Sequence, residues 1–215
     1  MRSLSASMLL YAVTDRAWLR GRTLPDCVAA ALAGGVTFVQ LREKHVSFDE
    51  RCTLAREILP LCQAAGVPFV IDDDVEAALA VGACGVHVGQ SDAACAVARA
   101  ALGPDKIVGV SVQTVEQALA AQAAGADYLG VGALFGTATK PDAVEVTFDE
   151  LAAICGSVNI PVVAIGGLNA STVAQLKGTG VDGAAVVSAL FAADDIEAAA
   201  RELAGKLRGI VGMSK

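Results

Sequence analysis

Aromatic side chains and long apolar runs are both scarce in this sequence. Only 4% of the residues are aromatic although 54% are hydrophobic, so aliphatic side chains supply most of the apolar surface. That mixture is typical of helices packed closely on buried strands. No apolar run approaches the roughly 20 residues of a membrane span, and the segment Met8–Val13 is too short for a secretion signal with its cleavage site. We therefore expect a soluble protein without a membrane association.

A basic surface and metal-binding cysteine spacings are also lacking. The formal net charge is −7, whereas a nucleic-acid surface needs clustered lysine and arginine on one face. The six cysteines form no CxxC pair and no zinc-finger spacing, and apolar residues flank several of them. We interpret them as small core side chains of a reduced, cytoplasmic protein.

No charged linker and no Pro/Ser-rich break interrupts the chain, which predicts a single domain over residues 1–215. Short β-branched runs alternate with amphipathic runs rich in alanine and leucine, eight times in all. The predicted strands are Leu9–Val13, Thr37–Arg42, Phe69–Asp72, Gly85–Val88, Ile107–Val112, Tyr128–Val131, Val162–Ile165 and Ala184–Val187.

Start signals mark several of the intervening helices. Ser47, Thr114 and Thr147 are each followed three residues later by Glu or Gln, which matches the capping box of a helix N-terminus. One helix contains Pro60, which lacks a backbone N–H, so we expect the helix to kink or end early at this residue.

Repeated strand–helix order with short links requires a parallel sheet, and right-handed crossovers leave a closed barrel or an open doubly wound sheet. Eight units in this length favour the barrel, and no GxGxxG motif follows the first strand, which weakens the open alternative. We therefore predict an α/β fold of the (β/α)8 TIM-barrel type. In such a barrel the active site lies at the carboxyl ends of the strands.

Polar residues share one face of the second predicted strand. Gln40, Arg42 and Lys44 alternate with apolar residues, so the period of two places all three on the inner face. Two cationic side chains on the same face can bind phosphate oxygens, since arginine donates two parallel hydrogen bonds and lysine acts as a point charge. The alternative is a salt-bridged barrel mouth, in which the two cations pair with Glu43 or a neighbouring aspartate.

Carboxylates follow the third and fourth strands. The third strand ends in three consecutive aspartates, of which Asp73 is the second, and Asp92 follows the fourth. Because neighbouring strands lie roughly 4.8 Å apart, Asp73 and Asp92 could converge on Mg²⁺, which prefers carboxylate oxygens together with phosphate and water. Both residues also precede a predicted helix, so either could be an N-cap. Spacing alone does not decide between these roles.

The last three strands end in segments that suit an anion. Gly132–Lys140 carries two hydroxyls and a lysine that can fold over a phosphate, although a surface loop bounded by glycine would look similar. Gly166-Gly167 and Val187-Ser188 close the seventh and eighth strands, where phosphate-binding barrels place an anion on backbone N–H groups. The sequence thus predicts two anion sites, one cationic and one lined by backbone.

Together these segments resemble the thiamine-phosphate synthase family from Leu10 to Ser188. The resemblance lies in the order and spacing of VQLREK (Val39–Lys44), DDDVEAALAVGACGVHVGQSD (Asp72–Asp92), GVSV (Gly109–Val112), ADYLGVGALFGTATK (Ala126–Lys140) and AIGGL (Ala164–Leu168). It implies a Mg²⁺-dependent transferase of alkyl or aryl groups. Its substrates would be hydroxymethylpyrimidine diphosphate and hydroxyethylthiazole phosphate, and its products thiamine phosphate and diphosphate.

The resemblance also implies roles for individual residues. Asp73 and Asp92 would bind Mg²⁺. The pyrimidine diphosphate would be held by Gln40, Arg42, Lys44, Asp72, Ser111 and Lys140. The thiazole phosphate would be held by Thr137, Thr139, Gly167, Val187 and Ser188. Arg42, Lys44, Lys140 and Ser111 would serve catalysis by stabilising the departing diphosphate, and His87 would either orient ligands or hydrogen-bond within the barrel.

Three departures and two alternatives accompany this prediction. The family often has Asn, His and Pro where this sequence has Asp72, Gln113 and Gly136. A related thiazole tautomerase would bind only the thiazole phosphate and would not need both cations and both metal carboxylates. A non-catalytic barrel that binds phosphorylated ligands would show binding without turnover. We expect small-molecule partners and neither nucleic acid nor membrane, and the sequence leaves a homo-oligomer open.

Overall fold

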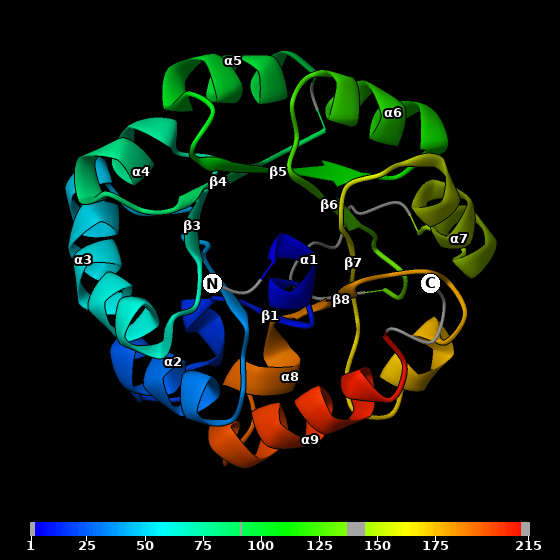
Figure 1. Ribbon diagram of the computed structural model, residues 1–215. Helices are drawn as coiled ribbons and strands as arrows, with labels where there is room; N and C mark the ends of the chain where they lie inside the picture. Colours follow the sequence, from blue (N-terminus) through cyan, green and yellow to red (C-terminus); the bar gives the residue numbers. More distant parts are fainter. Residues whose placement is uncertain (1–2, 91, 137–144, 212–215) are drawn as a thin grey trace.

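A closed barrel of eight parallel strands forms the centre of the protein (Figure 1). The computed structural model describes residues 3–90, 92–136 and 145–211, apart from the side chains of residues 92 and 93. Each strand pairs with the next along the chain, and the first pairs with the last. The strands are β1 (Leu10–Val13), β2 (Phe38–Leu41), β3 (Phe69–Asp72), β4 (Gly85–Val88), β5 (Ile107–Val112), β6 (Tyr128–Val131), β7 (Val162–Ile165) and β8 (Gly183–Val186).

The predicted TIM barrel is therefore confirmed, and the open doubly wound alternative is wrong. The predicted bounds of β3 to β7 agree with the structure, whereas β1 and β2 are shorter than predicted and β8 begins and ends one residue earlier. Side-chain hydrogen bonds flank the regular ladder at both ends of β2. Thr37 Oγ1 accepts from the backbone N–H of Leu10, and Thr14 Oγ1 accepts from that of Arg42.

Helices surround the barrel on its outside (Figure 1). The outer helices are α2 (Leu24–Ala33), α3 (Phe48–Ala65), α4 (Val75–Val81), α5 (Asp92–Leu102), α6 (Val115–Ala123), α7 (Phe148–Ser157) and α9 (Ile196–Arg208). Short pieces complete the order: α1 (Leu4–Ser7), α8 (Ser188–Phe191) and the 3-10 turns η1 (Arg16–Trp18) and η2 (Val173–Leu176). Within the described ranges, none of the helices combines the length and apolar character needed to cross a membrane.

The predicted caps are confirmed, but the effect expected of Pro60 is partly wrong. The side chains of Ser47, Thr114 and Thr147 each accept a hydrogen bond from the backbone N–H three residues later. Helix α3 does not end at Pro60 but continues to Ala65. The carbonyl that loses its partner to the proline belongs to Arg56, which lies on the exposed face, where water can replace the missing N–H.

Two apolar layers follow from the alternation of side chains along the strands. Valine and leucine at one set of positions, such as Val39 and Val86, pack outward against the helices. The other set, which includes Tyr11, Phe38 and Tyr128, fills the barrel interior. Helix α1 lies over the amino-terminal mouth of the barrel in Figure 1, and its Leu4 packs against this interior cluster. Within the described residues the cysteines form no disulfide, and four of the six are buried as the sequence predicted.

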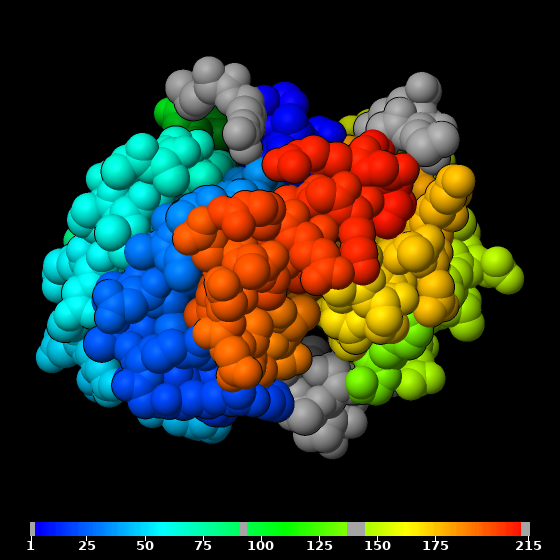
Figure 2. Space-filling view, turned by 90° about the horizontal axis from the view of Figure 1, so that it is seen from below, coloured from blue at the N-terminus to red at the C-terminus, as the bar shows by residue number. Residues whose placement is uncertain are grey.

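The first and last outer helices, α2 and α9, lie side by side and complete the ring (Figures 1 and 2). Gly34 ends α2 at the point of closest approach. A Cβ atom on Gly34 would lie 2.4 Å from the carbonyl oxygen of Glu197 and 2.5 Å from the Cβ of Ala200. The missing side chain therefore lets the two helices meet.

Candidate active site

A cavity of about 220 Å³ opens at the carboxyl ends of the strands. Its lining comes from all eight strands or the residues that follow them, which is the position that the barrel fold predicts for an active site. The structure brings nine of the predicted site residues to this cavity: Gln40, Arg42, Lys44, Asp72, Asp73, Ser111, Gly167, Val187 and Ser188.

The polar residues of β2 and its extension face the cavity as the period of two predicted. Gln40 is buried, with 4% of its surface exposed, and Arg42 and Lys44 lie further out at the rim. Among the described residues Arg42 forms no ion pair, so its positive charge is available to a ligand. Glu43, the partner considered from the sequence, instead pairs with Arg16 at 2.8 Å.

Lys44 forms the salt bridge that was considered as an alternative to phosphate binding. Its Nζ lies 2.6 Å from an oxygen of Asp72 and 2.5 Å from one of Asp73. Desolvation opposes the charge on Lys44, but the hydrogen bonds to the two carboxylates outweigh it and raise the pKa of the ammonium group. The three side chains thus form a compact group with one negative charge in excess. Lys44 is committed to these carboxylates in the protein without ligands.

The three consecutive aspartates of the β3–α4 link have separate roles. Asp74 caps α4 by accepting from the backbone N–H of Ala77 at 2.8 Å. Asp73 adopts a left-handed conformation with φ 58°, which turns its side chain toward the cavity. The alternative role of Asp73 as an N-cap is therefore wrong. Asp92 is the first residue of α5, and its side chain lies outside the described part. The described residues contain no group of three acidic, histidine or cysteine side chains that could hold a metal.

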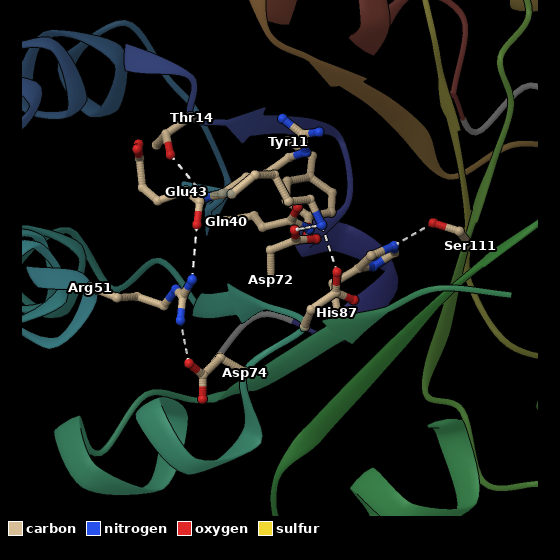
Figure 3. Close-up of polar contacts among 12 residues, drawn as sticks. Tyr11, Thr14, Gln40, Glu43, Arg51, Asp72, Asp74, His87 and Ser111 are labelled. Carbon is tan, nitrogen blue, oxygen red and sulfur yellow. Dashed lines mark hydrogen bonds and ion pairs between the residues drawn. The ribbon is translucent and has the colours of Figure 1, made fainter. Parts of the chain in front are cut away.

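A second ion network lies behind the rim and holds the segment that carries Arg42 and Lys44. Arg51 pairs with Asp74 and also donates to the backbone carbonyl of Glu43 at 3.0 Å (Figure 3). Burial raises the pKa of the Glu43 carboxyl, and its hydrogen bond with Arg16 acts in the opposite direction. This network joins α3, the end of β2 and the start of α4, and so fixes the rim from the outside.

A line of hydrogen bonds, which we name the tyrosine–histidine chain, crosses the floor of the cavity. Gln40 Nε2 donates to the hydroxyl of Tyr11 at 2.6 Å, and the hydroxyls of Tyr11 and Tyr128 lie 2.8 Å apart. Tyr128 lies 2.9 Å from Nδ1 of His87, and Nε2 of His87 lies 2.9 Å from Ser111 Oγ. Figure 3 shows the last of these contacts, with Gln40 and Tyr11 on the other side of the cavity floor. Of the two roles considered for His87, hydrogen bonding within the barrel is confirmed.

The predicted backbone site lies on the opposite wall. Gly166 and Gly167 have φ values of 100° and 64°, which favour glycine, and a Cβ on either would collide with the segment after β6. Val187 and Ser188 lead from β8 into α8 and face the same space. The predicted residues Thr137, Thr139 and Lys140 lie outside the described residues.

Tyr11, Tyr128 and Arg51 are site residues that the sequence analysis did not find. Tyr11 and Tyr128 belong to predicted strands, but their contact crosses the barrel and depends on its closure. One signal was present in the sequence: Gly109 and Gly130 interrupt two strands, and a glycine within a strand indicates a close approach. Arg51 is an ordinary helix residue by its spacing and gave no signal.

The fold and the cavity define a class of protein: a (β/α)8 barrel with a polar, partly cationic pocket at the carboxyl ends of its strands. The sequence profile described as thiamine monophosphate synthase matches residues 10–190. This chain belongs to that family.

Relatives of known name agree with this assignment. The chain is 46% identical to thiamine-phosphate synthase of Clostridium tetani over 205 residues, covering 95% of this chain and 98% of the relative. It is 50% identical over 194 residues to the synthase of Ruminiclostridium cellulolyticum, covering 90% and 92%. Among solved structures, the thiamine phosphate pyrophosphorylase from Pyrococcus furiosus superposes with a TM-score of 0.89 at 38% identity, covering 97% of this chain and all of that one.

Proposed function

We propose that this protein is a thiamine-phosphate synthase, which joins hydroxymethylpyrimidine diphosphate to hydroxyethylthiazole phosphate and releases diphosphate. The single observation that carries the proposal is Arg42, a cation without an ion-pair partner in the described structure, at the rim of a cavity with a polar floor. A partly exposed guanidinium without an ion-pair partner can bind the oxygens of an anion directly. The opposite wall, at Gly167 and Ser188, offers a second place for a phosphate.

The side chains support a substitution that starts with departure of diphosphate. Arg42 would neutralise the negative charge that grows on the leaving group, together with Lys44 and the predicted Lys140. The aminopyrimidine ring delocalises the positive charge left on its methylene carbon, and the thiazole nitrogen then forms the new C–N bond. This sequence of bond changes needs no protein nucleophile. The protein's contribution is to place two anionic substrates side by side in one cavity.

The residues present fit the Mg²⁺ that the family implies. Asp73 lines the cavity and its carboxylate contacts a cation there, the ammonium group of Lys44, so this carboxylate can face a positive charge at the site. Carboxylate oxygens are the ligands that Mg²⁺ prefers, and the ion when bound would neutralise diphosphate charge. Asp73 and Asp92 are the proposed ligands. Lys44 would then exchange its carboxylate partners for oxygens of the diphosphate.

The three departures from the family pattern are compatible with this proposal. Asp72 adds a negative charge beside the diphosphate site, and in the protein without ligands it pairs with Lys44. Gln113 is not among the described residues that line the cavity, and its backbone N–H donates to Gln117 in the first turn of α6. A side chain at Gly136 would be in ordinary contact with Glu145 at 3.7 Å, so this glycine does not serve to relieve a collision.

The direct test is release of diphosphate when both substrates are mixed with the protein, with Mg²⁺ present or removed by EDTA. We expect turnover that depends on both substrates and is lost with EDTA. Arg42→Gln should lower kcat/KM by about 10²–10³-fold, as expected for loss of one group that stabilises transition-state charge. Arg56→Gln, on the exposed face of α3, is the matched control and should leave turnover unchanged.

The alternatives predict different results in the same assay. A non-catalytic barrel would bind the two phosphorylated compounds without releasing diphosphate, and a tautomerase would bind the thiazole phosphate alone. Either result would refute the synthase proposal. A cytoplasmic location, a single domain over residues 1–215 and small-molecule partners, with neither nucleic acid nor membrane, remain predictions, and the sequence leaves a homo-oligomer open.

A further inference from the structure

The tyrosine–histidine chain has a direction that its first donor sets. An amide nitrogen can only donate, so Gln40 Nε2 gives a hydrogen bond to the oxygen of Tyr11. The proton of the Tyr11 hydroxyl then needs another acceptor, and its remaining partner in the described structure is the oxygen of Tyr128. Tyr11 is 1% exposed, and leaving its proton without an acceptor would be costly. Tyr11 therefore donates to Tyr128.

The same argument continues to the other end of the chain. Tyr128 is fully buried and accepts from Tyr11, so its own proton goes to Nδ1 of His87. An imidazole that accepts at Nδ1 carries its proton on Nε2. Nε2 then donates to Ser111 Oγ, and the Ser111 proton is directed to a further acceptor. Because Ser111 lines the cavity, that acceptor can be an atom of the ligand.

Both phenols keep the protons that this direction requires. Burial is the main cause that raises the pKa of Tyr11 and of Tyr128 well above the usual range of a phenol. Deprotonation at physiological pH would break the order of donors, and the buried surroundings prevent it.

Two glycines in the strands make room for the chain. A Cβ on Gly109 would lie 2.1 Å from Cζ of Tyr128, and a Cβ on Gly130 would lie 3.2 Å from Cε1 of His87. Gly109 has ordinary negative φ, so no backbone conformation requires glycine at this position. A glycine within a strand weakens the strand, and the space it leaves is filled by the ring of Tyr128. The two glycines thus lower the stability of their strands but leave the space that the side chains of the tyrosine–histidine chain occupy.

We propose that Tyr128 is a positioning residue for the pyrimidine substrate: acting through His87, it fixes Ser111 as a hydrogen-bond donor toward the cavity, while Tyr11 fixes the amide of Gln40. Tyr128 itself does not line the cavity, so it acts only through its neighbours. This inference rests on the proposed function for the identity of the ligand. An aminopyrimidine presents a ring nitrogen, which accepts, beside an amine, which donates. In the analogue with a ring carbonyl in place of the amine, the carbonyl accepts where the amine donates, and the neighbouring ring N–H donates where the ring nitrogen accepts. The order of donors in the tyrosine–histidine chain therefore favours the amino compound over this analogue.

The tautomer of His87 tests the direction without any assay of activity. The sequence has two histidines, and the other, His45, is exposed and outside the cavity. Nitrogen NMR of isotope-labelled His45→Gln protein therefore reports His87 alone. We expect the proton on Nε2 and an unprotonated Nδ1. A neutral ring with its proton on Nδ1, or a doubly protonated ring at neutral pH, would overturn the inference, whether or not the protein is a synthase.

The variant Tyr128→Phe removes the donor to Nδ1 and nearly preserves the shape of the ring. In the same spectrum we expect a mixture of the two tautomers. In steady-state kinetics we expect KM for the pyrimidine diphosphate to rise about tenfold, the effect of one weakened hydrogen bond, while KM for the thiazole phosphate stays the same. The preference for the amino substrate over its carbonyl analogue should shrink by a similar factor. An unchanged tautomer and unchanged preference in the folded variant would refute the role of Tyr128.

Discussion

Replacing Gly109 with alanine tests whether Tyr128 occupies the only space available to it. The added Cβ would lie 2.1 Å from Cζ and 2.3 Å from the hydroxyl oxygen of Tyr128, well inside contact distance. Tyr128 is fully buried among Tyr11, Phe38 and the barrel wall, so its ring cannot turn aside without displacing them. The hydrogen bonds to Tyr11 and His87 would then be lost or stretched.

The expected loss of stability combines three effects. Overpacking of a filled core costs about 1–3 kcal/mol, and loss of two buried hydrogen bonds costs about 1 kcal/mol each. Alanine recovers about 0.5–1 kcal/mol, because glycine is the poorer residue within a strand and is more flexible when unfolded. The free energy of unfolding should therefore fall by roughly 3 kcal/mol, which corresponds to a Tm lower by about 6–12 °C for a protein of this size.

Thermal unfolding followed by circular dichroism measures this effect. Gly205→Ala is the matched control, because Gly205 lies within α9 and an added Cβ there would meet nothing within 4 Å. That control should raise stability by about 0.5–1 kcal/mol, the difference in helix propensity. A Gly109→Ala protein as stable as the wild type, with the His87 tautomer unchanged, would show that the ring of Tyr128 can relocate freely and that the packing argument is wrong.

Three further predictions concern the frame around the site. Gly34→Ala should lower the free energy of unfolding by about 1–3 kcal/mol through overpacking against α9, measured by urea unfolding; a neutral result would mean that the two helices can separate freely. Arg51→Met should cost about 1–3 kcal/mol, since it removes the cation paired with Asp74 and the donor to the part-buried carbonyl of Glu43; unchanged stability would contradict this. Burial raises the pKa of the Cys62 thiol to about 12, so iodoacetamide at neutral pH should modify Cys84, which is partly exposed, well before Cys62 by mass spectrometry; equal rates would refute this order.

The fold could be predicted because the sequence repeats one local pattern. Strand bounds from β3 to β7 follow from short β-branched runs between helix caps, and the phase of Gln40, Arg42 and Lys44 follows from the period of two within one strand. These are local properties, which neighbouring residues determine. The error at Pro60 has a local cause too, because the exposure of the preceding turn decided whether the helix could continue.

What the sequence left undecided depends on contacts between strands. Spacing could not separate a cap from a cavity residue among three consecutive aspartates, because the left-handed turn at Asp73 decides which carboxylate points inward. The pairing of Lys44 with Asp72 and Asp73 requires β2 beside β3 in a particular register. The tyrosine–histidine chain joins β1, β2, β4, β5 and β6, and only the closed barrel brings them together.

Closure of the sheet also has a consequence for how the protein is made. β1 hydrogen-bonds to β8, which is synthesised more than 160 residues later. Helix α2 likewise packs against α9, which follows it by a similar length of chain. Until Gly183–Val186 has left the ribosome, both β1 and β7 present an open edge that can pair with another chain. A polypeptide truncated after β7 should therefore aggregate rather than persist as a smaller, folded fragment, because the backbone groups at the edges of β1 and β7 stay unpaired.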